Sequence, residues 1–240
     1  MTSDVAPAAI AAGRIAAFYR SPVGKKIITG VTGLALASFV LIHMLGNLVL
    51  LFSPAAYNQY GYVIERLGPL IWGIELVLLT AVVFHAVLGI QIFLGKLKAR
   101  PVGYDQYHSA GAPSQQSLSS RSMIWTGLIL AGFLVWHLST FKFGTYYTVG
   151  STVGGSDRRD LARLVFEKFH QPLYAFGYTG ILVLLGLHLR HGLWSAWQSI
   201  GAMSQGLKPV AYSLALMFAV AIALGFMVLP LAIYFGLIGS

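Results

Sequence analysis

The residues of this chain best suited to chemistry are four histidines, each lying well inside a long apolar run. They are His43, His85, His137 and His188. An ionisable side chain at membrane depth is costly, and such residues usually face the bundle interior and mark a functional site. A single such histidine more often bonds a carbonyl on a neighbouring helix. One histidine in each of four runs is harder to explain in this way and indicates a functional site, for which imidazole, a common metal ligand, is a suitable group.

The composition restricts the chemistry and the solvent. There is no cysteine, which excludes disulfides, Cys-ligated iron–sulfur clusters and thiol-attached haem. The chain is 57% hydrophobic and only 10% charged, which indicates lipid rather than water as its surroundings. Its net charge of +9 does not indicate nucleic acid, because the basic residues lie at the ends of apolar runs, where they contact lipid headgroups.

Five apolar runs predict an all-α integral membrane bundle of five transmembrane helices, forming one membrane domain over residues 1–240. A bilayer core of about 30 Å needs ~20 residues of helix, which each run provides, the fourth only narrowly. We expect a haem-binding core formed by the first four helices, and a short amphipathic surface helix within residues 157–168. The expected spans are Ile27–Phe52, Leu67–Leu94, Met123–Phe141, Pro172–Leu189 and Val210–Ile238.

The distribution of Lys and Arg predicts the orientation. The N-terminal segment, the second connection and the fourth connection together carry ten of these residues, and the other side carries six. Because cytoplasmic loops are enriched in Lys and Arg, we expect a multi-pass protein of the cytoplasmic membrane. Its N-terminus should lie in the cytoplasm and its C-terminus outside.

The depth of each histidine follows from its distance along its span. His43 lies about 24 Å and His137 about 21 Å into spans that run outwards, so both are expected near the outer side. His85 lies about 27 Å and His188 about 24 Å into spans that run inwards, so both are expected near the inner side. The sequence therefore predicts two pairs, His43 with His137 and His85 with His188.

Two imidazoles that converge from different helices provide the axial ligands of a six-coordinate haem, and helix bundles build such sites in their cores. The spacing alone does not exclude a proton relay or a bound ion. A relay would need carboxylates at middle depth, where only Glu75 is available. Gly46, Gly89 and Gly192 follow ligand candidates by three or four residues, and they either make room for a flat ligand or serve close helix packing.

At these residues the chain resembles the dihaem cytochrome b membrane-anchor subunit of succinate dehydrogenases and fumarate reductases. The resemblance is to the single-chain, five-helix type that works with menaquinone. It rests on the order and spacing of short motifs along nearly the whole chain. These are SPVGKK, TGLAL, LIHMLGN around His43, FHAVLG around His85, VWHLST around His137 and LHLRHGLWSA around His188.

The resemblance implies ligands, partners and a reaction. It implies two haem b groups, an outer one held by His43 and His137 and an inner one held by His85 and His188. It also implies a flavoprotein subunit with FAD, and an iron–sulfur subunit that passes electrons through the haems to a membrane quinone, expected to be menaquinone. The chain would then be the quinone-reactive subunit of a succinate:quinone oxidoreductase, without activity on succinate by itself.

The resemblance also bears on neighbouring residues. Its pattern places the ligand four residues before the Gly-Leu-Trp step, which favours His188 over His191. Glu65 is a candidate proton carrier at an outer quinone site, and an equally good interpretation is a solvated residue paired with Arg66. Inner basic residues are candidates for the haem propionates, although such residues more often face headgroups; they are Lys25, Lys26, Arg100 and Arg190.

Two other functions remain as alternatives. Cytochrome b subunits of hydrogenases and formate dehydrogenases also use intramembrane histidines and a quinone, but with a different distribution of ligands over the helices. A transporter whose histidines bind protons or substrate would favour repeated halves and broken helices, and neither is evident in the sequence.

Overall fold

The structure is a computed structural model that describes residues 7–99, 118–149 and 158–239. Five of its helices are long and apolar enough to cross a membrane. This confirms the predicted all-α bundle and its five transmembrane helices. The five are α2 (Pro22–Leu48), α4 (Pro69–Ala99), α6 (Met123–His137), α8 (Pro172–Ser199) and α9 (Lys208–Tyr234).

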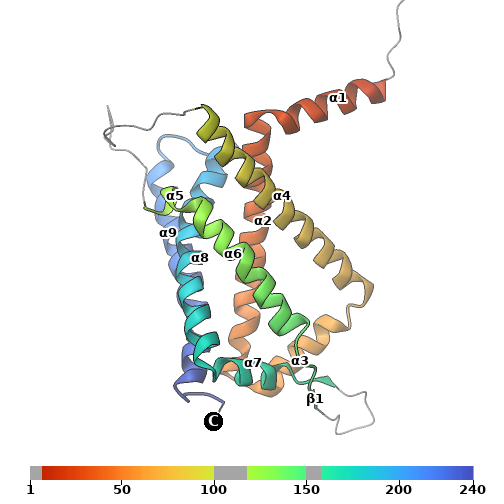
Figure 1. The fold of residues 1–240 in the computed structure, drawn as a ribbon, viewed down its shortest axis with the longest axis vertical. Helices are drawn as coiled ribbons and strands as arrows, with labels where there is room; N and C mark the ends of the chain where they lie inside the picture. Colours follow the sequence, from red (N-terminus) through yellow and green to blue (C-terminus); the bar gives the residue numbers. More distant parts are fainter. Residues whose placement is uncertain (1–6, 100–117, 150–157, 240) are drawn as a thin grey trace, which may run out of the picture.

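The five helices form one bundle in which consecutive helices from α2 to α9 run in opposite directions (Figure 1). Helices α2, α6 and α9 begin at the end of the bundle where α1 (Pro7–Arg20) lies, which we call the α1 end. They finish at the opposite end, where α3 (Pro54–Glu65) and α7 (Leu161–Phe169) lie, which we call the α7 end. Helices α8 and α9 pack side by side, and α2 packs against both α4 and α8.

Several helices extend past the apolar runs that predict them. Helix α8 continues to Ser199, ten residues beyond the expected end at Leu189, so the fourth span is not short. The expected end was set by the first charge, Arg190. Backbone hydrogen bonding does not stop where the side chains become polar, so the helix continues through that residue. Helix α2 also begins earlier than expected, at Pro22 instead of Ile27. Ser21 caps this helix by accepting a hydrogen bond from the Gly24 amide.

Two spans change their winding near the α7 end. A 3₁₀ turn, η1 (Val49–Leu51), continues α2, and a π-helical turn, η2 (Leu138–Lys142), continues α6. The π-helical turn begins directly after His137. Single π-helical turns inside α-helices occur frequently at functional sites.

Short elements close the α7 end of the bundle. Helix α7 buries Ala162, Leu164, Val165 and Phe169 and exposes Arg163, which confirms the predicted amphipathic surface helix. The strands β1 (Thr148–Val149) and β2 (Arg158–Arg159) form an antiparallel pair just before it. Helix α3 fills the first connection and was not predicted. A further short helix, α5 (Leu118–Arg121), precedes α6 at the α1 end.

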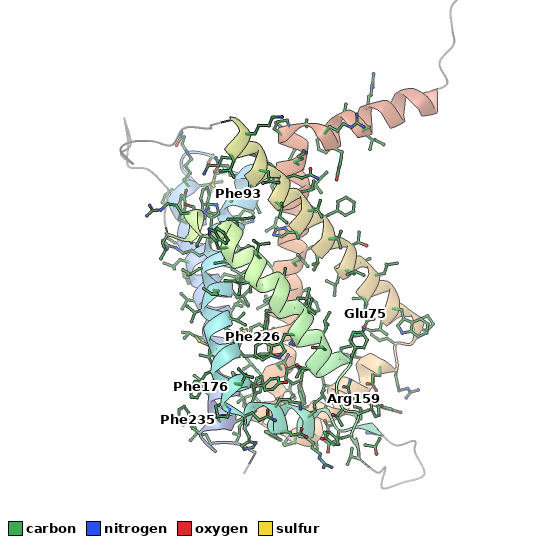
Figure 2. The ribbon with its side chains drawn as sticks, in the orientation of Figure 1. Glu75, Phe93, Arg159, Phe176, Phe226 and Phe235 are labelled. Atoms are coloured by element: carbon green, nitrogen blue, oxygen red, sulfur yellow. The ribbon has the colours of Figure 1, made fainter. Side chains whose placement is uncertain are left out.

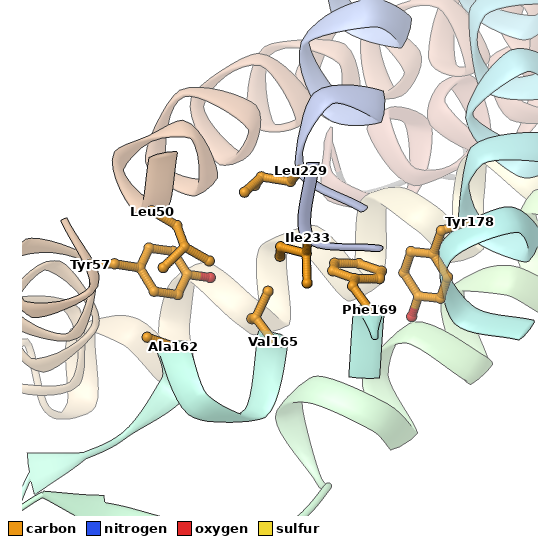
Figure 3. Packing of buried hydrophobic residues seen from close by; sticks show 8 residues of the cluster. All are labelled: Leu50, Tyr57, Ala162, Val165, Phe169, Tyr178, Leu229 and Ile233. Carbon is orange, nitrogen blue, oxygen red and sulfur yellow. The ribbon is translucent and has the colours of Figure 1, made fainter. Parts of the chain in front are cut away.

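A hydrophobic cluster joins these short elements to the spans. Figure 3 shows Tyr57 of α3, Val165 and Phe169 of α7, Tyr178 of α8 and Ile233 of α9 meeting in it. Away from the cluster the long helices expose large apolar side chains; in their most apolar stretches only 11–33% of residues are buried by the chain itself. Such surfaces require lipid, so the chain is a multi-pass membrane protein.

Candidate functional site

The structure brings the four span histidines together two by two. The ring centres of His43 and His137 lie 5.8 Å apart, and those of His85 and His188 lie 6.2 Å apart. The first pair joins α2 to α6 near the α7 end of the bundle, and the second joins α4 to α8 nearer the α1 end. These are the same two pairs that the depths along the spans predict.

The ring of His85 is fixed by the neighbouring helix α2. Its Nδ1 lies 3.1 Å from the backbone carbonyl oxygen of Thr29. A carbonyl can only accept, so Nδ1 carries the proton and Nε2 keeps its free lone pair. Gly33 lies one turn further along α2, and a Cβ added there would stand 2.9 Å from Cε1 of His85. Glycine at this position therefore makes room for the imidazole.

His188 is held in a parallel way by α6. Its Nδ1 lies 3.0 Å from the hydroxyl oxygen of Thr126, a buried residue. That hydroxyl is 3.1 Å from the carbonyl oxygen of Ser122, to which it donates, so it accepts the proton of Nδ1. Gly127 lies against the ring, where an added Cβ would be 3.3 Å from Cε1. In this pair both Nε2 atoms are therefore free to bind a metal.

The His43/His137 pair has a more aromatic setting. His43 stacks on Phe39 with ring centres 5.4 Å apart. Its Nε2 is 3.4 Å from the amide nitrogen of Asn47, a long contact that engages the ring weakly. Asn47 in turn accepts a hydrogen bond from the hydroxyl of Tyr57 at 3.0 Å. The Nδ1 of His137 is buried and has no hydrogen-bond partner among the described residues.

Both pairs fit the axial positions of a haem. Metal–imidazole bonds are about 2 Å long, so two rings on opposite sides of one metal have centres about 6 Å apart. The observed separations of 5.8 and 6.2 Å agree with this distance. No group of three or more His, Cys, Asp or Glu side chains within residues 7–99, 118–149 and 158–239 is placed to hold a metal ion. A porphyrin needs only two protein ligands, because it supplies the other four itself.

The glycines near the histidines differ in role. A Cβ added at Gly89 or Gly192 would meet no atom within 4 Å, so these two glycines do not serve close helix packing in the described structure. At Gly46 an added Cβ would be 2.7 Å from the ring of Tyr60, so here packing is the reason for glycine. Open space therefore lies next to Gly89 and Gly192, one turn after His85 and His188.

Among the residues that the structure describes, the carboxylates do not form a chain between the histidine pairs. Glu75 lies only six residues into α4, about 9 Å from its start, rather than at middle depth. It pairs with Lys142, the last residue of η2. Glu65 ends α3, is exposed, and makes no ion pair with a described residue, so its expected pairing with Arg66 is not observed.

The remaining candidates lie away from the pairs. The ring of His191 packs against Trp194, with centres 4.9 Å apart, whereas His188 faces His85. His170 is exposed and contacts the carbonyl of Phe166. At the α1 end, Lys26 and Arg190 are exposed and Lys25 is half-buried. Arg100, the fourth of these basic residues, and the histidine His108 lie outside the described residues.

Several residues around the histidines were missed by sequence reasoning. Thr29 acts through its backbone carbonyl, which no side-chain pattern reveals. Thr126 could have been found, because a hydroxyl inside an apolar run needs a partner. Asn47 also carried a signal, since it lies four residues after His43 and shares its helix face.

A comparison with known families supports this architecture. Residues 27–107 match the model of the family described as succinate dehydrogenase/fumarate reductase transmembrane subunit. The matched range includes His43 and His85. Comparisons with curated proteins and with solved structures found no match. Over residues 27–107 the chain is therefore similar to the transmembrane subunits of succinate dehydrogenases and fumarate reductases, and its five apolar helices make it a multi-pass membrane protein.

Proposed function

We propose that this subunit carries two b-type haems and passes electrons through them between an iron–sulfur partner and a membrane quinone. The single observation that carries the proposal is the meeting of four span histidines in two pairs, with ring centres 5.8 and 6.2 Å apart. When bound, a haem accepts and releases single electrons at a potential set by its ligands and surroundings.

The residues of the chain have distinct roles in this proposal. His43 and His137 hold the haem nearer the α7 end, and His85 and His188 hold the one nearer the α1 end. The Thr29 carbonyl and the Thr126 hydroxyl fix the ring orientation of the second pair, as outer-shell partners of metal-bound histidines commonly do. The apolar helix faces around the pairs would keep water from a bound haem.

The proposed partners follow from the family. A flavoprotein with FAD interconverts succinate and fumarate, and an iron–sulfur subunit connects it to the haem of the His85/His188 pair. That pair lies nearer the α1 end, which faces the cytoplasm in our orientation, because ten of the 16 Lys and Arg residues lie on that side. Menaquinone is the proposed electron acceptor, and Glu65 is a candidate proton carrier for it.

A reduced-minus-oxidised optical spectrum of the purified protein tests the proposal. Two b-type components, with about two haems per chain by extraction, are the expected result. A protein purified from haem-sufficient cells without a b-type band would refute the haem proposal and leave a transporter or a purely anchoring role. A b-type band in a preparation that carries hydrogenase or formate dehydrogenase subunits would instead support the alternative complexes.

A further inference from the structure

Two consecutive arginines at the α7 end of the bundle have different surroundings. Arg158 and Arg159 form β2, and successive residues of a strand point to opposite faces. Arg158 donates to the side chain of Gln59, and its guanidinium lies 4.4 Å from the ring centre of Tyr62. This contact is on the exposed side. Arg159 points the other way.

Arg159 is a cation without an anionic partner among the described residues. Its Nη2 donates to the backbone carbonyl of Phe141 at 2.7 Å, and its guanidinium carbon lies 5.2 Å from the ring centre of Tyr146. Its Nε is buried and has no hydrogen-bond partner within the described ranges. A buried donor on a charged group that stays unpaired is costly, so this arrangement indicates a further ligand.

The guanidinium is connected to both histidines of the His43/His137 pair through neighbouring residues. Phe141, whose carbonyl accepts from Arg159, packs its ring against His137 with centres 5.4 Å apart. The hydroxyl of Tyr57 donates to Asn47, which contacts His43. Tyr57 also interacts electrostatically with Arg159. Burial, the main cause, and Tyr60 raise the pKa of Tyr57, whereas the positive charge of Arg159 lowers it. Figure 2 shows Arg159 at the α7 end, beyond the last turn of α6.

The other cations that flank this region already have partners. Lys142 pairs with Glu75, and Lys168 pairs with Glu167. Arg163 lies 4.2 Å from the ring centre of Tyr147 on the exposed side of α7. Among the basic residues described at this end, Arg159 combines a buried unpaired donor with contact to a residue that packs on a span histidine.

We infer that the guanidinium of Arg159 binds a propionate carboxylate of the haem held by His43 and His137. The inference rests on the proposed function. Guanidinium and carboxylate match in shape and form strong, often bidentate hydrogen bonds. The carboxylates of a haem between transmembrane helices are most stable towards a membrane surface, because charge is costly at the bilayer centre. The α7 end, where Arg159 lies, is the nearer surface for this pair.

A redox titration of the b-type absorbance in the intact complex tests the inference, with three variants. Arg159→Gln should shift the midpoint of one component to a more negative potential, because loss of a nearby cation favours the oxidised haem. The shifted component should be the one that His137→Ala removes. Arg159→Lys should shift it less, since it keeps the charge. Arg158→Gln, the matched control on the exposed side, should leave both midpoints unchanged.

Several results would overturn the inference. Equal midpoints in the Arg159→Gln and Arg158→Gln proteins would do so, as would a shift of the component that His188→Ala removes. Unchanged midpoints with a raised KM for a quinone analogue would assign the guanidinium to quinone instead. If the Arg159→Gln protein cannot be produced in folded form, an unshifted midpoint in Arg159→Lys would count against the inference. Wild-type protein without b-type haem refutes the proposed function itself, whereas two wild-type haems with unshifted midpoints refute only the role of Arg159.

Discussion

The Nδ1–H of His85 donates to the backbone carbonyl of Thr29, on a neighbouring helix and 56 positions earlier in the chain, at 3.1 Å. This one bond selects the tautomer of the imidazole and fixes the plane of its ring. The hydroxyl of Thr126 does the same for His188 at 3.0 Å. The His85/His188 pair is therefore organised for metal binding by α2 and α6, helices that do not carry its two histidines.

Replacing Thr126 by Val should weaken the haem held by His85 and His188. The change keeps the shape of the side chain but leaves Nδ1 of His188 without its acceptor. Loss of an outer-shell partner typically lowers metal affinity by about 10–100-fold, so this haem should be partly lost on purification and its midpoint should change. Haem extraction and a redox titration measure both effects.

Two further variants control this prediction. Thr126→Ser keeps the hydroxyl and should restore haem content and midpoint. Thr80→Val removes a hydroxyl that bonds only within its own exposed helix face, and it should change neither. If Thr126→Val retains both haems with unchanged midpoints, the Thr126 hydroxyl does not position the ligand.

Replacing Gly33 by Ala should displace the ring of His85. The new methyl group would stand 2.9 Å from Cε1 of the ring, which is closer than packed carbons approach. The ring would have to rotate, which breaks its bond to the Thr29 carbonyl. We expect a smaller or shifted signal from one b-type component in the difference spectrum. Gly95→Ala, where the methyl group meets no atom within 4 Å, should leave the spectrum unchanged.

The ion pair between Glu75 of α4 and Lys142 of η2 should couple these two helices. Both side chains are only partly exposed, and Glu75 lies on the part of α4 near its first residue (Figure 2). Removing one partner leaves a single charge at the edge of the membrane. Glu75→Gln and Lys142→Gln should each lower the thermal midpoint of the complex more than the double variant does.

The corresponding coupling energy should be about 0.5–1 kcal/mol, the range expected for charges that remain in contact with solvent. The measurement is a thermal unfolding series on the four proteins of the double-mutant cycle. If the destabilisation of the double variant equals the sum of the two single effects, the coupling energy is zero and the ion pair does not stabilise the protein.

The long helices could be predicted from the sequence because the bilayer imposes a simple requirement. A run of about 20 apolar residues satisfies it, and each run in this chain corresponds to one span. The ends of the spans were less predictable. Arg190 marks the end of the apolar run but lies within α8, because helical hydrogen bonding continues where the side chains become polar.

Helix α3 was not predicted because it depends on distant contacts. Its sequence mixes apolar, polar and aromatic residues, and its position is fixed from outside. Asn58 of α3 donates to the Asp160 carboxylate at 2.9 Å and accepts from the backbone amide of Ala162 at 2.9 Å. These partners lie more than 100 positions away in the sequence, and helix propensity depends only on nearby residues.

The candidate site was predictable in its main lines and not in its details. Depth along each span pairs the histidines, because helix rise per residue is constant. It does not reveal the Thr29 carbonyl, which belongs to the backbone. The charge of Arg159 gave no signal either, because it follows another arginine and only the strand pairing with Thr148 and Val149 separates their directions.

The most direct test of the account is a redox titration of the b-type absorbance in five single alanine variants. His43→Ala and His137→Ala should lose the same component and keep the other. His85→Ala and His188→Ala should lose the component that the first two keep, and His191→Ala should lose neither. Any other grouping, or loss of a component in His191→Ala with retention in His188→Ala, would contradict the pairing of the four histidines.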